Sequence, residues 1–208
     1  LTLRKQSHGG FYTGNEADRL RTILSLCELQ PDYLDLEHDI PTDFCEKIHR
    51  LYPDIQLICS LHDFEKTPSD LNTTLSTMQN TWAAYYKIAT YANSAIDALQ
   101  MLQLIRSVKN TIGICMGKHG QATRILGKLL GSPFTYTCLT QQEISAPGQL
   151  TLSELRNIYH VHQHKPTTEI YALLGDPIDK SVGHLLHNQA IRFLKKDAVY
   201  IKIAIAPT

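Results

Sequence analysis

The sequence lacks several features that would assign it to a class at once. Its 208 residues contain no C-x-x-C pair, no signal-peptide-like start and no apolar run near the roughly 20 residues that a membrane-spanning helix needs. An odd number of cysteines without paired spacing argues against both a disulfide framework and a zinc site. We therefore expect reduced thiols in the core of a cytoplasmic protein, at Cys27, Cys45, Cys59, Cys115 and Cys138.

An excess of charge of either sign is also missing. Acidic and basic residues number 20 each, and no block of Lys and Arg interrupts an ordinary hydrophobic fraction of 43%. Such a chain offers no electrostatic case for binding nucleic acid or an anionic membrane. The expected partner is a small molecule, and the sequence gives no indication of an oligomeric state.

Apolar periodicity predicts strands that alternate with helices. We expect strands at residues 1–4, 33–37, 55–60, 85–90, 111–116 and 134–137. We expect helices at residues 20–27, 43–51, 67–83, 95–108, 121–130 and 152–159. Such repeats indicate parallel βαβ units, in a (β/α)8 barrel or a doubly wound sheet.

The positions of the polar residues favour the barrel. Arg4, Glu37, His62 and Lys87 are each predicted at or just beyond the carboxyl end of a strand. Barrel enzymes build their sites at that face, whereas a doubly wound sheet gathers them at one switch point.

The character of the chain changes after residue 160. We predict a first domain over residues 1–160, a polar linker over 161–168 and the opening βαβ unit of a second α/β domain over 169–208. His160, His162 and His164 alternate near the linker, but no carboxylate or cysteine neighbours them to complete a site. No metal site is therefore predicted.

Lys87 is a lone cation within the strand-like run Tyr85-Tyr86-Lys87-Ile88-Ala89-Thr90. If that strand is buried on both faces, the ammonium points inward beside Tyr85 and Ala89. Burial lowers the pKa of a lysine and yields the neutral amine that can attack a carbonyl and form an imine. The alternative is a solvated lysine on an edge strand.

Three separated motifs carry a family resemblance. Ser60-Leu61-His62-Asp63-Phe64, Lys87-Ile88-Ala89 and Ser145-Ala146-Pro147-Gly148-Gln149 occur in that order. They resemble the S-x-H-D-F, K-I-A and S-A-P-G-Q signatures of the type I 3-dehydroquinate dehydratase family, over about residues 1–160. The resemblance implies a TIM-type (β/α)8 barrel whose first two strands would precede Leu1. It also implies a lyase of the shikimate pathway, which makes aromatic amino acids, that converts 3-dehydroquinate to 3-dehydroshikimate.

The same resemblance assigns catalytic roles. Lys87 would form a protonated imine with the substrate ketone, and this electron sink would make the neighbouring carbon acidic. His62 would remove that proton as general base and then, once charged, assist the departing hydroxyl as general acid. No cofactor is implied for this half.

Substrate-binding residues follow in the same way. Arg124 matches the family arginine that binds the substrate carboxylate, and Arg4 matches one that holds the hydroxyl side. Ser145 and Gln149 match the mobile loop that covers the bound ring. As bare sequence, these positions would be solvated arginines and a surface turn.

The chain departs from the family at position 8. The family pattern R-x-x-x-E-G-G here reads Arg4, then His8-Gly9-Gly10. The family glutamate orients the catalytic histidine, so its replacement predicts weaker turnover. Either a neutral His8 accepts a hydrogen bond, or a nearby carboxylate such as Glu37 substitutes; the sequence leaves both open.

The last part of the chain resembles the substrate-binding half of shikimate dehydrogenases. Gly175-Asp176-Pro177-Ile178-Asp179-Lys180-Ser181 and the following His187-Asn188 fit the pattern G-x-P-I-x-x-S-x-S-P-x-x-H-N, but Gly183 and His184 replace its second serine and its proline. Shikimate binding therefore rests on Ser181. The NADP-binding domain of such an enzyme would follow Thr208, so the chain is expected to be a fragment of a dehydratase fused to a shikimate dehydrogenase.

Two other readings stay open from the sequence. Another lysine-imine barrel of aldolase type would share Lys87 but has no reason to keep the loop from Ser145 to Gln149. A metabolite-binding module without turnover is favoured by the shortened barrel and by His8.

Overall fold

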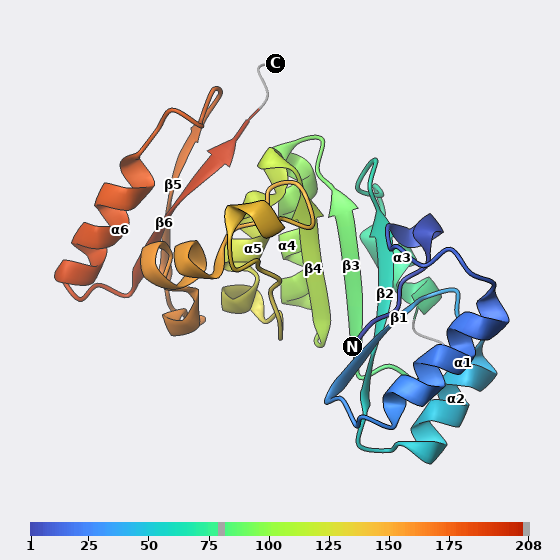
Figure 1. The fold of residues 1–208 in the computed structure, drawn as a ribbon. Helices are drawn as coiled ribbons and strands as arrows, with labels where there is room; N and C mark the ends of the chain where they lie inside the picture. The colour runs from blue at the N-terminus through green and yellow to red at the C-terminus, as the bar shows by residue number, and fades with distance from the viewer. Residues whose placement is uncertain (79–81, 206–208) are drawn as a thin grey trace.

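The computed structural model describes residues 1–78 and 82–205 and contains two parallel sheets (Figure 1). The larger sheet has the order β1-β2-β3-β4 and the smaller one pairs β5 with β6. The strands are β1 (Tyr33–Glu37), β2 (Gln56–Asp63), β3 (Tyr85–Tyr91), β4 (Thr111–Met116), β5 (Glu169–Gly175) and β6 (Ala198–Ala204).

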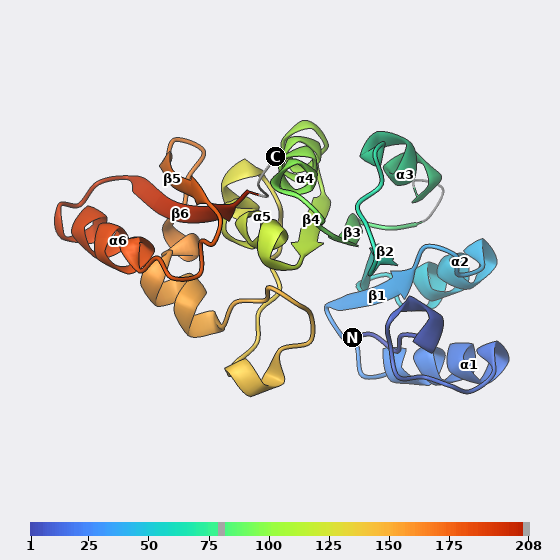
Figure 2. The ribbon, with the colours of Figure 1, turned by 90° about the horizontal axis from the view of Figure 1, so that it is seen from above.

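Helices connect successive strands within each sheet, as is usual for parallel strands. The helices are α1 (Glu16–Cys27), α2 (Thr42–Leu51), α3 (Leu71–Met78), α4 (Ala95–Ser107), α5 (Gln121–Leu126) and α6 (Gly183–Phe193). Of these, α1 precedes β1 and α5 follows β4. Viewed from above, α2, α3 and α4 lie along one side of the larger sheet, which leaves its other side for the N-terminal segment (Figure 2). We call that second side the inner face.

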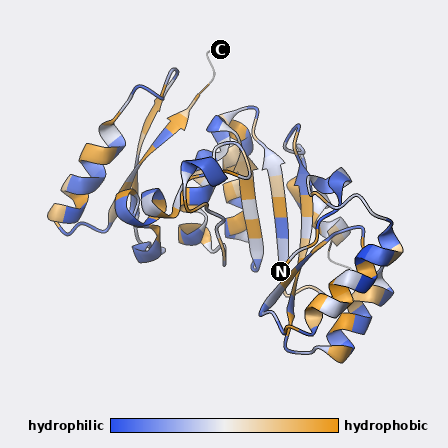
Figure 3. Cartoon of the chain, viewed as in Figure 1, coloured by the Kyte–Doolittle hydropathy of each residue, from blue (hydrophilic) through white to orange (hydrophobic). Residues whose placement is uncertain are grey.

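Side chains of successive strand residues point alternately toward the helices and toward the inner face. Leu34 and Ile88 point toward the helices and are fully buried in two apolar clusters. Hydrophobic and hydrophilic residues alternate along the strands and helices (Figure 3). The register pairs Ser60 with Lys87 and His62 with Ala89, so Ser60, His62 and Lys87 share the inner face. This confirms the predicted common face of Tyr85, Lys87 and Ala89.

Two of the six predicted strands are wrong. Residues 1–4 lie beside β1 through Asp35 N donating to Leu1 O and the Leu1 amino group donating to Tyr33 O, without forming a ladder. In residues 134–137, Phe134 packs edge-on against Tyr33 and Tyr85 instead of pairing its backbone. The described part of the larger sheet therefore has four strands and is open.

The predicted helices differ mainly at their ends. The helix expected over residues 67–83 is α3, which covers Leu71–Met78, and residues 79–81 lie outside the described part. The helix expected over 121–130 ends at Leu126 and continues as a 3₁₀ turn, Lys128–Leu130. Residues Glu154–Ile158 form a π-helical turn in place of a regular last helix.

In the second unit, β5 and β6 are parallel and α6 connects them. This unit is not separated from the first by a free linker. Val199 and Ile201 of β6 belong to the same apolar cluster as Ile125 and Tyr159, and Val161 of the expected linker belongs to it too. The two units therefore share one core.

All five cysteines are buried, which agrees with the expected core thiols. Within the described ranges, every helix is too short or too polar to cross a bilayer.

A buried ion pair attaches α1 to the carboxyl end of β1. Arg19 is fully buried, and its guanidinium donates to Glu37 at 2.8 Å and to Leu3 O at 2.8 Å. The other Glu37 oxygen accepts from the backbone N of Lys5 at 2.9 Å. Glu37 therefore fixes the N-terminal segment, including Arg4, against the inner face.

We expect Glu37→Ala to lower the free energy of unfolding by about 2 kcal/mol, because Arg19 would lose its buried partner and keep only the half-exposed Glu16. Urea unfolding followed by circular dichroism measures the loss. Glu28→Ala, at an exposed position just after α1, is the control. Equal losses in the two variants would contradict a structural role for this pair.

Candidate active site

Asp35 is the centre of a polar network on the inner face. Its Oδ2 accepts from Lys87 Nζ at 2.8 Å, and its Oδ1 accepts from Arg4 Nη2 at 2.7 Å and from the Ser60 hydroxyl at 2.6 Å. Asp35 and Lys87 are 8% and 5% exposed. Three separate parts of the chain therefore converge on one buried carboxylate.

The strands explain why these side chains meet. Asp35 lies in the middle of β1, and Lys87 is the third residue of β3, not at the carboxyl end as predicted. Ser60 pairs with both Glu37 and Lys87 in the register, so the stagger of the parallel strands brings Lys87 level with the end of β1. The long lysine side chain then spans β2 to reach Asp35.

His62 is the second reactive group of the network. Its Nε2 lies 3.0 Å from Arg4 Nη1, and its ring stacks on Phe64. Because a guanidinium only donates, Nε2 must accept and the imidazole must be neutral. Burial, together with the cations Lys87 and Arg4, lowers the pKa of His62 to about 3. The ring is therefore a free base at neutral pH.

Burial lowers the pKa of Lys87 below its ordinary value, although Asp35 opposes this by stabilising the ammonium. Burial would raise the pKa of Asp35, but Lys87 and Arg4 outweigh it and hold that carboxyl ionised. The site thus combines a firmly anionic carboxylate with an amine that loses its proton more easily than usual. Such an amine suits nucleophilic attack on a carbonyl.

Arg124 and Tyr136 close the other side of Lys87. The Lys87 ammonium lies 4.2 Å from the centre of the Tyr136 ring, and Arg124 Nη1 donates to Tyr136 O at 3.2 Å. Arg124 is 2% exposed, burial lowers its pKa to about 10, and its Nε has no partner among the described residues. A buried guanidinium so placed favours an anionic ligand.

The loop of Ser145 and Gln149 is anchored at the carboxyl end of β4. Gly117 N donates to Pro147 O at 2.9 Å, and Gly148 packs so closely on Gly117 that a side chain there would collide with its backbone. Ser145 donates from its backbone N and its hydroxyl to Gln149 Oε1. Within the described ranges, these two side chains bond to each other and not to the Asp35 network.

Position 8 lies beside His62 without bonding to it. Gly9 packs against Phe64, the ring that stacks on His62. His8 Nε2 lies 3.4 Å from Asp39 Oδ2. Among the described residues, neither His8 nor Glu37 bonds to His62 Nδ1, which is buried without a hydrogen-bond partner. The suggestion that Glu37 substitutes for the family glutamate is therefore wrong, because Arg19 and Lys5 N occupy it.

His8, His38 and Asp39 are the residues best placed to hold a metal ion. Their ligand atoms lie within 4.8 Å of one another. Lys5 Nζ, however, donates to Asp39 Oδ2 at 2.7 Å and already supplies a cation there. Across the part of the chain that the structure describes, the histidines 160, 162 and 164 do not form such a group.

The sequence reasoning missed Asp35, Ser60 and Tyr136. Asp35 had a usable signal, because it alternates with Leu34 and Leu36 and so must point to the face opposite those two buried leucines. Ser60 begins the S-x-H-D-F motif but was given no role. Tyr136 was assigned to a strand that does not form.

The family model for type I 3-dehydroquinase matches residues 1–166. The chain belongs to the type I 3-dehydroquinase family. Among curated relatives, the bifunctional 3-dehydroquinate dehydratase/shikimate dehydrogenase of Arabidopsis thaliana is 32% identical over 99% of this chain and 35% of its own length. The shikimate biosynthesis protein AroDE of Chlamydia muridarum is 38% identical over 90% of this chain and 39% of its own.

A solved structure supports the same family assignment. The crystal structure of the 3-dehydroquinate dehydratase of Geobacillus kaustophilus matches with a TM-score of 0.68 and 28% identity over 78% of this chain and 66% of that one. The chain spans little more than a third of the length of the two curated relatives above, at 35% and 39%.

We expect the pKa of His62 to rise by about one unit or more in Lys87→Met, because removing a neighbouring cation makes the imidazolium less unfavourable. Histidine NMR spectra recorded from pH 3 to 8 measure it, with the exposed His49 as internal reference. An unchanged His62 titration would contradict the electrostatic account of its neutral state.

Proposed function

We propose that the chain carries out the dehydration of 3-dehydroquinate to 3-dehydroshikimate through an imine on Lys87. The observation that carries this proposal is the contact of Lys87 with Asp35 at 2.8 Å, beside a His62 whose neighbours keep it neutral. Family membership supports the reaction and the use of a lysine imine without a cofactor.

In the first step, the neutral Lys87 amine attacks the substrate ketone carbon, and loss of the carbonyl oxygen as water leaves a protonated imine. Asp35 stabilises positive charge on this nitrogen, as ammonium before the attack and as iminium after it. The proton that leaves the ammonium passes to solvent or to a departing oxygen. Tyr136, whose ring covers Lys87, helps to keep the nitrogen out of bulk water.

In the second step, His62 removes a proton from the carbon next to the iminium and becomes an imidazolium. The electron pair then expels the β-hydroxyl, which takes the same proton and leaves as water. Hydrolysis of the iminium releases 3-dehydroshikimate and restores Lys87, so one water is lost overall. The depressed pKa of His62 makes its imidazolium a strong acid for the second half of this exchange.

Two arginines support binding of the substrate carboxylate and hydroxyls. Arg124 is buried without a carboxylate partner among the described residues, and Arg4 is held by Asp35 with its other nitrogen on His62. We assign the carboxylate to Arg124 and the hydroxyl side to Arg4. Ser145 and Gln149 would turn toward the ring when their loop closes, since among the described residues their side chains now bond to each other and leave the network free.

Borohydride reduction in the presence of 3-dehydroquinate tests the imine. We expect a covalent mass increase that peptide mapping locates at Lys87, because reduction traps the iminium as a stable secondary amine. The comparison variant is Lys118→Arg, at a half-exposed lysine outside the network, which should label as the parent chain does.

Lys87→Arg keeps a cation beside Asp35 but cannot form the imine, so it should not be labelled. An adduct on another lysine, or none on a folded chain, would overturn the proposal and leave a binding role. Labelling by an aldol-type ketone as strongly as by 3-dehydroquinate would favour a different lysine-imine enzyme.

For the second unit, we propose that the turn after β5 binds the carboxylate of shikimate through Ser181, as the opening part of an NADP-dependent shikimate dehydrogenase. Ser181 Oγ accepts from Gly183 N at 3.3 Å, and Lys202 Nζ donates to Ser181 O at 3.0 Å. This turn thus holds a hydroxyl beside a cation, which suits a carboxylate. The bifunctional relatives support the order of the two units. The burial of all five thiols in the core supports a reducing, cytoplasm-like compartment.

We expect Ser181→Ala to weaken shikimate binding roughly tenfold, which corresponds to the loss of one hydrogen bond to a charged group. Isothermal titration with shikimate measures the dissociation constant, and Ser153→Ala, at an exposed position, is the control. Equal affinities of the two variants would remove Ser181 from the site.

A further inference from the structure

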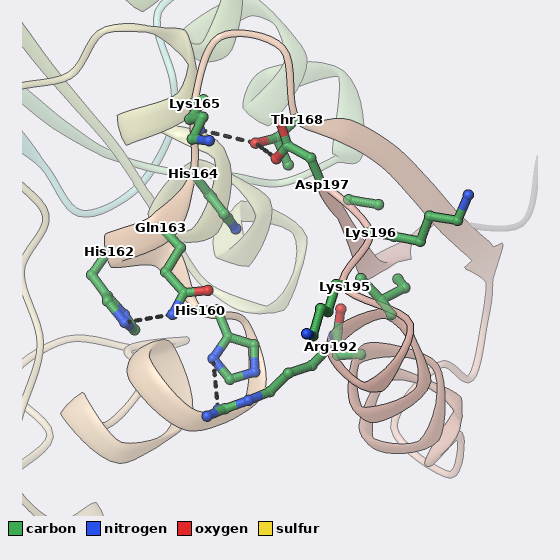
Figure 4. Close-up of a pocket in the computed structure, with 13 residues that line it drawn as sticks. His160, His162, Gln163, His164, Lys165, Thr168, Arg192, Lys195, Lys196 and Asp197 are labelled. Atoms are coloured by element: carbon green, nitrogen blue, oxygen red, sulfur yellow. Dashed lines mark hydrogen bonds between the residues drawn. The ribbon is translucent and has the colours of Figure 1, made fainter.

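A cavity of about 660 Å³ lies between the two units and away from the Asp35 network (Figure 4). One wall is the segment 160–168, which follows the π-helical turn, and the other is the carboxyl end of α6 with the start of β6. No residue of β1 to β4 lines it. Its volume falls within the roughly 300–1,000 Å³ of small-molecule sites.

The lining of this cavity is strongly basic. It includes one carboxylate, Asp197, and four permanent cations, Lys165, Arg192, Lys195 and Lys196. The whole chain has equal numbers of acidic and basic residues, 20 each, so the excess is local. Three imidazoles, those of His160, His162 and His164, add further donors from the first wall.

Asp197 interacts with Lys165 and offsets only part of this positive charge. Its two oxygens accept from the hydroxyls of Thr168 at 2.6 Å and Thr167 at 3.0 Å. The Thr168 hydroxyl in particular holds the pKa of Asp197 below its usual range. Arg192 Nη1 lies 3.5 Å from His160 Nδ1, across the cavity mouth. Among the described residues, none of the four cations pairs with a carboxylate.

A helix end alone does not explain this arrangement. Cations near the carboxyl end of α6 interact favourably with the helix dipole, which accounts for Arg192 and Lys195. The last carbonyls of α6 are already satisfied, since Leu194 N donates to Ala190 O and Lys196 N to Ile191 O. Lys165 and the buried His164 come from the opposite wall and gain nothing from that dipole.

We propose that this cavity binds a small polyanion of the diphosphate class, held between the two units. Arg192 offers the planar fork that binds phosphate through two parallel hydrogen bonds, and the lysines supply point charges around it. A diphosphate carries two linked phosphate groups, so we assign one to Arg192 and Lys195 and the other to the wall of Lys165. The inference does not depend on the proposed dehydratase chemistry.

Isothermal titration of the 208-residue chain with inorganic pyrophosphate tests the proposal. We expect saturable binding of one pyrophosphate per chain that weakens as salt rises toward about 0.15 M. Arg192→Gln combined with Lys195→Gln should weaken it roughly tenfold or more, as the loss of charge-assisted hydrogen bonds predicts. Lys165→Gln, on the other wall, should weaken it as well.

The matched control is Lys47→Gln combined with Lys109→Gln, which removes two exposed lysines elsewhere in the chain. It should change the affinity by no more than about twofold. Equal weakening in the control, an unaffected Lys165→Gln, or no saturable binding would overturn the proposal. Citrate that binds as tightly as pyrophosphate would overturn the assignment to the diphosphate class.

Discussion

The site depends on one buried carboxylate shared by two cations. Asp35 lies between Lys87 and Arg4, and no other carboxylate among the described residues bonds to either of them. A buried charge is costly without a partner of opposite sign, so Asp35 stabilises both Lys87 and Arg4 on the inner face. The sharing also leaves a positive excess, to which Arg124 adds. Burial of the ring, together with the cations Lys87 and Arg4, lowers the pKa of His62 and keeps it neutral, and the excess favours an anionic ligand.

The position of Arg4 depends in turn on a second buried ion pair. Residues 1–4 form no strand, yet Arg4 reaches both Asp35 and His62. The segment is held because Glu37 binds Arg19 and also accepts from Lys5 N, while Arg19 bonds to Leu3 O. A glutamate that first suggested a catalytic role is therefore structural, and its effect on the site acts through the backbone next to Arg4.

Much of the fold and of the site was predictable from local patterns, and the errors have physical causes. The alternation around Lys87 correctly predicted β3, and the apolar run of residues 111–116 correctly predicted β4. In both strands the local sequence pattern matches the burial of the side chains. Phe134 and Tyr136 have equally strong strand preferences but pack as side chains on the inner face. Whether residues 134–137 form a strand depends on packing against Tyr33 and Tyr85, which are distant in sequence.

Within the site too, local motifs were predictable, whereas contacts between distant residues were not. The motifs identified His62, Lys87 and Arg124, and the structure brings these side chains to one network around Asp35 and Tyr136. Asp35 itself was missed because its partners lie 31 and 52 residues away along the chain. Ser145 and Gln149 were correctly paired with a turn, but no local pattern could say that this loop bonds internally.

The common core of the two units has a consequence for how such a chain can change. Val161, Val199 and Ile201 pack with Ile125 in a single apolar cluster. Cleavage near residue 165 would expose apolar surface on each of the two pieces. Neither piece is therefore expected to behave as an independent module. Replacing one unit by that of a homologue would succeed only if the apolar residues packed between the two units were redesigned as well.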